Sequence, residues 1–304
     1  MNGTLAVARY TLIELSRRRI LVVFFVLGVL GIAVVGFGLK LFGSSFSSGI
    51  SFGPPGSAPD PVKVNRFLEL SFVSNLVGAL GLFALLIAFA IGMTVIYHDL
   101  DSGAAVAIFS KPVSRLAFAV GKLMAAIAAM IAIVGLLSVE ARLMMLLFGG
   151  GGDLQQTLWV EAAAQVANAI ALMLIVMALS TWMNNIVAAV VGFIYHGVAG
   201  VAVLLHDQYQ TGSFGHNDLL GAGFTALYWL VPHQLMSDAA RQLARAEYDL
   251  FSSASTGGGN GPPPVDQVLA GIPGASGTAD IIWWAFGILV FASLVYFAVR
   301  RRQV

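Results

Sequence analysis

Residues 20–41 read ILVVFFVLGVLGIAVVGFGLKL, a run in which Lys40 is the one charged side chain. A hydrocarbon layer about 30 Å thick needs roughly 20 apolar residues in a helix to cross it. The run is longer than the apolar core of a secretory signal peptide, which has roughly 7–15 residues. No small-x-small cleavage site lies at the expected place. We therefore expect a retained membrane-spanning helix.

The whole chain shares this apolar character. Of its 304 residues, 58% are hydrophobic and 10% are charged, whereas about a quarter of the residues of an average soluble protein are charged. A chain of this composition lacks the residues for a polar surface. Its net charge of +1 gives no electrostatic reason to expect a nucleic acid as partner. It has no cysteine, which excludes disulfides and Cys-based metal sites.

Apolar runs of sufficient length predict an all-α integral membrane protein with a single domain over residues 1–304. We expect six transmembrane helices, at about 20–41, 70–97, 116–147, 159–182, 186–206 and 280–299. Residues 3–18 precede them and place apolar side chains at helical spacing, at Leu5, Ala8, Leu12 and Leu15. Such a helix beside a span is expected to lie in the membrane interface.

Two long connections separate these helices. Residues 43–68 are rich in Gly, Ser and Pro and indicate a loop, and residues 207–279 form the largest polar segment. Within it, residues 232–251 are predicted to be helical, with an apolar stripe at Leu235, Ala239, Leu243, Ala246 and Leu250.

The charges predict the orientation. Six spans place both termini on one side, and that side would hold ten of the sixteen Lys and Arg residues. Cytoplasmic loops carry the excess of Lys and Arg. Both termini are therefore expected in the cytoplasm, residues 207–279 outside it, and the chain in a bacterial cytoplasmic (inner) membrane.

A polar stretch between the second and third spans reads IYHDLDSGAAVAIFSKPVSRLAFAVGK, residues 96–122. Pro112 stops or starts a helix, and Ser110 is a candidate cap for a helix whose first turn holds this proline. Lys111 and Arg115 are four residues apart, which predicts one shared helical face. The alternative interpretation is that these cations only fix the topology and contact lipid headgroups.

This stretch resembles the first cytoplasmic loop of ABC transporter permeases of the type-2 (ABC-2) exporter class. The matching residues are Asp99, Gly103, Ser110, Pro112, Ser114, Arg115, Gly121 and Lys122. The sequence departs from the family pattern in having Asp rather than Glu at position 99, Leu100 in place of Arg and Ala104 in place of Thr. These departures concern the acid-pair contact of the family and not its topology.

The resemblance implies that residues 98–115 form a cytoplasmic coupling hairpin that docks on a separate ATPase subunit. The residues implied in this coupling are Asp99, Asp101, Gly103, Ile108, Phe109, Ser110, Lys111, Pro112, Ser114, Arg115, Gly121 and Lys122. It further implies a permease dimer, most simply a homodimer, with the second and fifth spans along the translocation path. An accessory protein could bind the external segment 207–279.

ATP and Mg²⁺ would bind to the partner ATPase, and no cofactor or catalytic residue is expected in this chain. A phosphate-binding Walker A loop needs Gly-x4-Gly-Lys-Ser/Thr. Around Gly121 and Lys122 the pattern fails, because Leu116 stands at the first glycine position and Leu123 at the hydroxyl position. Two other functions stay open, a membrane-embedded enzyme and an ATP-independent channel or carrier.

Three of the polar residues within the predicted spans are candidates for a site inside the membrane. Asn75 lies in the second span, and Glu140 and Arg142 lie late in the third. Ionisable residues at membrane depth are costly and often functional. Glu140 and Arg142 are two positions apart and do not face each other on a helix. They belong either to the outer headgroup region or to a substrate or packing site, whereas Asn75 is predicted to bridge helices.

Overall fold

The structure is a computed structural model that describes residues 3–47, 60–101, 113–149, 154–212, 217–231, 233–252, 264–269 and 272–301. Within these ranges the chain forms helices and no strand. In chain order they are α1 (Gly3–Ser16), α2 (Arg19–Ser47), α3 (Pro61–Thr94), α4 (Tyr97–Asp101), α6 (Arg115–Met144), the π-helical turn η1 (Met145–Gly149), α7 (Gln155–Ser180), α8 (Asn185–Gln210), α9 (Asp218–Leu230), α10 (Ala239–Ser252), α11 (Val265–Leu269) and α12 (Thr278–Arg301).

Six of these helices are long and apolar enough to cross a membrane: α2, α3, α6, α7, α8 and α12. The prediction of an all-helical chain with six such helices is confirmed. Apolar surroundings offer no water to the backbone, and a helix satisfies its backbone hydrogen bonds internally. Long apolar runs therefore favour helices. The position of α1 in the membrane interface stays a prediction. Of the four apolar residues predicted for its stripe, Ala8 and Leu15 are buried, whereas Leu5 and Leu12 are exposed.

The loop predicted at 43–68 is wrong at both ends. Helix α2 continues to Ser47, and α3 begins at Pro61, nine residues before the predicted start of the second span. Asp60 caps α3, because its side chain accepts a hydrogen bond from the Val62 N–H at 3.0 Å. Pro61 occupies the first helical position, where its missing N–H costs nothing.

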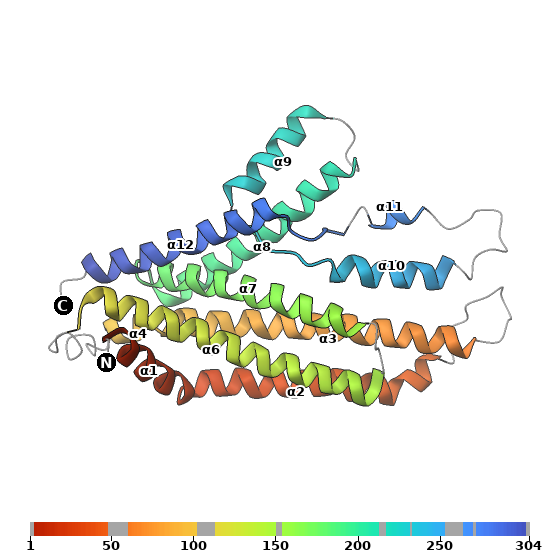
Figure 1. The fold of residues 1–304 in the computed structure, drawn as a ribbon, viewed down its shortest axis with the longest axis horizontal. Coiled ribbons are helices and arrows are strands. Elements are labelled where there is room, and N and C mark those ends of the chain that lie inside the picture. The colour runs from red at the N-terminus through yellow and green to blue at the C-terminus, as the bar shows by residue number, and fades with distance from the viewer. Residues whose placement is uncertain are drawn as a thin grey trace.

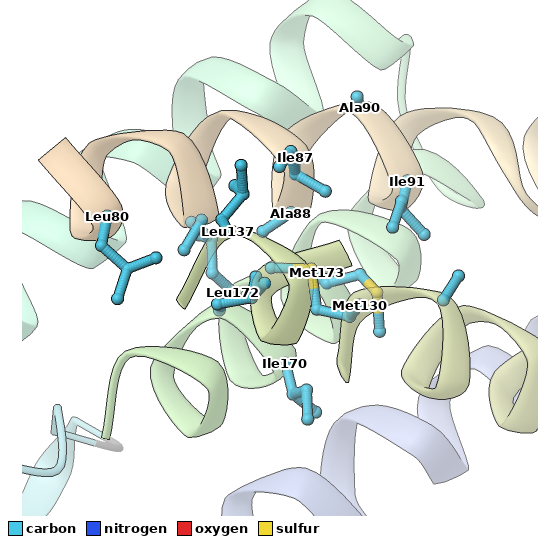
Figure 2. Packing of buried hydrophobic residues seen from close by; sticks show 14 of the residues in the cluster. Leu80, Ile87, Ala88, Ala90, Ile91, Met130, Leu137, Ile170, Leu172 and Met173 are labelled. Carbon is cyan, nitrogen blue, oxygen red and sulfur yellow. The ribbon is translucent and has the colours of Figure 1, made fainter. Parts of the chain in front are cut away.

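Helices α3 and α7 form the centre of the bundle, with α2 and α6 packed against α3 (Figure 1). Figure 2 shows their shared core, in which Ile87 and Ile91 of α3, Met130 and Leu137 of α6 and Met173 of α7 are fully buried. Helices α2, α8 and α12 lie at the edge of this core and keep long apolar faces exposed. Lipid or another apolar surface is needed to cover these faces.

The bundle is longer than a hydrocarbon layer. At about 1.5 Å per residue, the 34 residues of α3 span roughly 51 Å, against about 30 Å for the layer. Both chain termini and α4 lie at one end of the bundle, and α10 and α11 lie at the other (Figure 1). We call these the terminal end and the distal end. At the distal end, α10 packs on α3 and α7.

The helix predicted at 232–251 begins seven residues late, at Ala239. Residues 233–238 are not helical, because side chains from elsewhere bind their backbone. The Asn168 side chain of α7 both donates to and accepts from the Leu235 backbone, each at 2.8 Å, and Ser276 Oγ accepts from the Met236 N–H at 2.8 Å. Two residues of the predicted apolar stripe, Ala239 and Leu243, are buried.

Candidate functional site

A fully buried lysine organises the terminal end of the bundle. The Lys122 side chain of α6 has no exposed area, and its Nζ forms an ion pair with Asp99 Oδ2 of α4 at 2.6 Å. The same Nζ donates a hydrogen bond to Glu14 Oε2 of α1 at 3.2 Å. Asp99 is 4% exposed and Glu14 is 20% exposed. Helices α4 and α6 therefore meet the sequence-distant α1 at one ammonium group.

The charges of this cluster balance. Glu14 also pairs with Arg18, so two carboxylates face two cations. Burial alone acts to raise the pKa of Glu14, but the positive charges of Lys122 and Arg18 outweigh burial and lower its pKa. An unpaired buried charge is costly, so the cluster holds together only while each member keeps its partner. We call Glu14, Arg18, Asp99 and Lys122 the ion cluster.

The residue before Lys122 explains how α1 covers the cluster. A Cβ atom at Gly121 would lie 2.7 Å from the Thr4 carbonyl oxygen and 2.8 Å from Val7 Cβ, distances that real Cβ atoms do not tolerate. Glycine therefore lets α1 approach α6 closely enough to bury Lys122. The ammonium also lies 5.8 Å from the ring centroid of Phe118 and 5.9 Å from that of Tyr10, within reach of cation–π attraction.

The ion cluster joins the start of the predicted coupling hairpin, at Asp99, to Lys122, which follows the hairpin in sequence. Half of the predicted coupling residues fall outside the described residues, namely Gly103, Ile108, Phe109, Ser110, Lys111 and Pro112. Asp101 is the last residue of α4. Asp99 precedes the interval 102–112 and Lys122 follows it, and their ion pair brings the two sides of this interval together.

The prediction that Lys111 and Arg115 share one face of a single helix is wrong. Helix α6 begins at Arg115, and Ser114 is extended, with φ −68° and ψ 147°, so no single helix runs through both residues. Ser114 is the cap, and its Oγ accepts a hydrogen bond from the Ala117 N–H at 3.1 Å. Arg115 donates to the Arg300 carbonyl oxygen at 2.6 Å, where a cation stabilises the C-terminal end of α12.

The three polar residues predicted inside the spans behave differently from one another. Asn75 is exposed, and its amide donates to the Ser71 carbonyl of its own helix at 2.7 Å, so the described contact does not bridge helices. Glu140 and Arg142 are half-buried near the end of α6. Glu140 Oε2 and Arg142 Nη1 are shielded from solvent without a hydrogen-bond partner within the described ranges.

A second polar cluster lies where α8, α9 and α12 meet, and sequence reasoning missed it. Tyr228 donates to Asp280 Oδ1 at 2.7 Å, and the rings of His206 and His233 stack on the Tyr228 ring, with centroids 4.2 Å and 3.9 Å away. The lining of an adjoining pocket of about 310 Å³ includes Arg241, which pairs with Asp207 at 2.7 Å. No local sequence pattern indicates these contacts, because the paired residues are far apart in the chain. Tyr228 and Asp280 are separated by 52 residues, and Arg241 and Asp207 by 34.

No protein-family model and no curated protein matches this chain. Within the described ranges, no group of three or more His, Asp or Glu side chains is placed to hold a metal ion. The ion cluster and the helices that it joins are therefore the candidate functional site.

Proposed function

We propose that this chain is the membrane-spanning permease subunit of an ABC-type exporter. In this proposal residues 98–122 receive the motion of a separate ATPase subunit, which binds ATP and Mg²⁺. The observation that carries it is the buried ion pair between Asp99 and Lys122, which ties together the two sides of the interval 102–112. That the partner is an ATPase subunit is inferred from the resemblance of residues 99–122 to the coupling loop of ABC-2 permeases.

The ion cluster supports a mechanical role for this region. A force on residues 102–112 acts on α4 at one side and on α6 at the other, and the ion cluster joins both to α1. Because α4 directly follows α3, the force reaches the two longest helices of the bundle. Packed cores transmit displacement rather than absorb it, and the fully buried side chains between α3, α6 and α7 provide such a core.

Helix α6 has the length to carry this displacement across a membrane. Lys122 and Glu140 are 18 residues apart, which corresponds to about 27 Å along a helix and is close to the roughly 30 Å of a hydrocarbon layer. In the proposed arrangement the ion cluster lies at the cytoplasmic face. Glu140 and Arg142 then lie at the opposite headgroup region, which accounts for charged side chains so late in the helix.

The proposed complex contains two copies of this chain, two ATPase subunits and a translocation path between the permeases. The exposed apolar face of α8, which includes Val190, Ile194 and Val201, supports contact of the fifth span with lipid or a second copy. Helix α3 is packed against α2, α6 and α7, so the second span would reach the path only along its remaining edge. In the proposed complex an accessory protein binds residues 207–279.

The test compares two charge reversals at opposite ends of the bundle. Lys111→Glu changes the interval 102–112, and Arg245→Glu changes an exposed residue of α10 at the distal end. The complex is purified from native membranes and reconstituted in vesicles, and ATP hydrolysis is measured. We expect a stoichiometric ATPase partner whose activity falls with Lys111→Glu and is unchanged by Arg245→Glu.

Each rival function predicts another outcome of the same test. A channel or carrier would move its substrate in vesicles that contain this chain and no ATPase. A membrane-embedded enzyme would convert its substrate in detergent without ATP. Either result, or equal effects of the two charge reversals, would contradict the proposal.

A further inference from the structure

A pocket of about 380 Å³ lies beside the ion cluster, between α1 and α4. Its lining residues are Tyr10, Ile13, Glu14, Arg17, Arg18 and His98. Two of the six are arginines. The one acidic residue, Glu14, is already bound by Lys122 and Arg18. The pocket therefore has an excess of positive charge.

The two arginines of this pocket retain unused hydrogen-bond donors. The Nε–H of Arg18 is shielded from solvent and has no hydrogen-bond partner among the residues that the structure describes. Arg17 is exposed, and no described contact engages its side chain. A shielded donor without an acceptor costs free energy, and a bound anion would supply the acceptor. Arginine binds phosphate through two parallel hydrogen bonds, so phosphate suits this pair.

The position of the pocket indicates where the anion comes from. Arg17 and Arg18 form the turn between α1 and the spanning helix α2, so in a membrane they lie at the level of the lipid headgroups. The start of α2 adds the positive end of a helix dipole. Exposed apolar side chains adjoin the arginines, with Tyr10 54% exposed and Ile13 44% exposed. Lipid covers such apolar surface at an interface.

We infer that this pocket binds a phosphate ester, which the membrane supplies as the headgroup of an anionic phospholipid. Arg17 and Arg18 bind the phosphate oxygens, and Tyr10 and Ile13 contact the glycerol and the first part of the acyl chains. This inference goes beyond the proposed function and does not depend on it, because it requires only that the six apolar helices lie in a membrane. Through Arg18 the bound phosphate would contact the ion cluster.

The test measures how many phosphatidylglycerol molecules the purified chain retains in a neutral detergent, by native mass spectrometry during a lipid titration. Arg17→Ala is compared with Arg9→Ala, which removes the same charge from an exposed position of α1 outside the pocket. Both side chains are exposed, so neither change disturbs folding. Loss of a hydrogen bond to a charged group predicts roughly tenfold weaker phosphatidylglycerol binding for Arg17→Ala, and a change within about twofold for Arg9→Ala.

Two further measurements separate the sources of phosphate and the rival occupant. Phosphatidylglycerol should raise the melting temperature of the purified chain, and Arg17→Ala should reduce that rise, whereas glycerol phosphate at the same concentration should not raise it. An equal effect of glycerol phosphate would assign the site to a soluble phosphate ester and overturn the lipid assignment. Equal loss of lipid in Arg17→Ala and Arg9→Ala would mean that the cations attract anionic lipid without a specific site, and it would contradict the proposed phosphate site. If Arg17→Ala released an ATPase partner but kept the lipid, the pocket would bind that partner instead.

Discussion

Replacing Lys122 by methionine should destabilise the chain more than any surface substitution. Methionine keeps most of the side-chain volume but removes the charge that Asp99 faces at 2.6 Å. The attraction across that distance is about 6 kcal/mol at an effective dielectric constant near 20, and desolvation of the two ions offsets much of it. Removing one partner leaves the other charge buried and unpaired, which costs about 3–5 kcal/mol. We expect a loss of this size for Lys122→Met.

The double variant Lys122→Met with Asp99→Asn separates the ion pair from simple packing. With both charges removed, no unpaired ion remains, and the free energy of unfolding should return to within about 2 kcal/mol of the unmodified chain. Unfolding in mixed detergent and dodecyl sulfate micelles, followed by tryptophan fluorescence, measures both values. A loss below about 1 kcal/mol for Lys122→Met, or losses that simply add in the double variant, would refute the buried ion pair.

Three more predictions concern the same chain. Gly121→Ala should cost about 1–3 kcal/mol because its Cβ meets the backbone of α1, whereas Gly135→Ala on the same helix has open space and should cost nothing measurable; thermal unfolding compares them. Asn168→Ala removes both hydrogen bonds to the Leu235 backbone, so hydrogen exchange at residues 233–238 should become faster; unchanged exchange would show that other contacts suffice. Because the pKa of Glu14 is lowered in the folded chain, the ionised side chain contributes its full stabilisation above the ordinary pKa of 4.5 and loses it as the pH falls through the lower folded pKa. Glu14→Gln should therefore weaken the fall in the free energy of unfolding at acidic pH. An unchanged dependence on acidic pH would contradict the pairing of Glu14 with Lys122 and Arg18.

The sequence predicted the six long apolar helices because their signal is local. A run such as residues 20–41 has no other stable solution than a membrane or a buried core, and six runs of this kind are six helices in the structure. The sequence also contains the signal for the start of α3, because Asp60 and Pro61 are residue types that commonly begin a helix. The prediction placed these two residues in a loop because the residues before them are rich in Gly and Ser.

The contacts that build the candidate site were not local. Lys122 and Asp99 were named through a family resemblance, but Glu14 was not named as a site residue, because it lies 108 residues from Lys122 and reads as one more polar position of α1. The non-helical residues 233–238 were missed for the same reason, since the Asn168 side chain that binds them lies 67 residues away. Tertiary hydrogen bonds overrode a clear helical period there.

Cross-linking from single cysteines tests the central claim most directly, because the chain has no native cysteine. Lys111→Cys places a thiol in the interval 102–112, and Val62→Cys places one at an exposed position near the distal start of α3. With a short bifunctional reagent in native membranes, we expect position 111 to cross-link to an ATP-binding chain, with a yield that changes on addition of Mg-ATP and vanadate, and position 62 not to do so. A purified complex that contains the ATPase but cross-links to it from position 62 and not from position 111 would contradict the account.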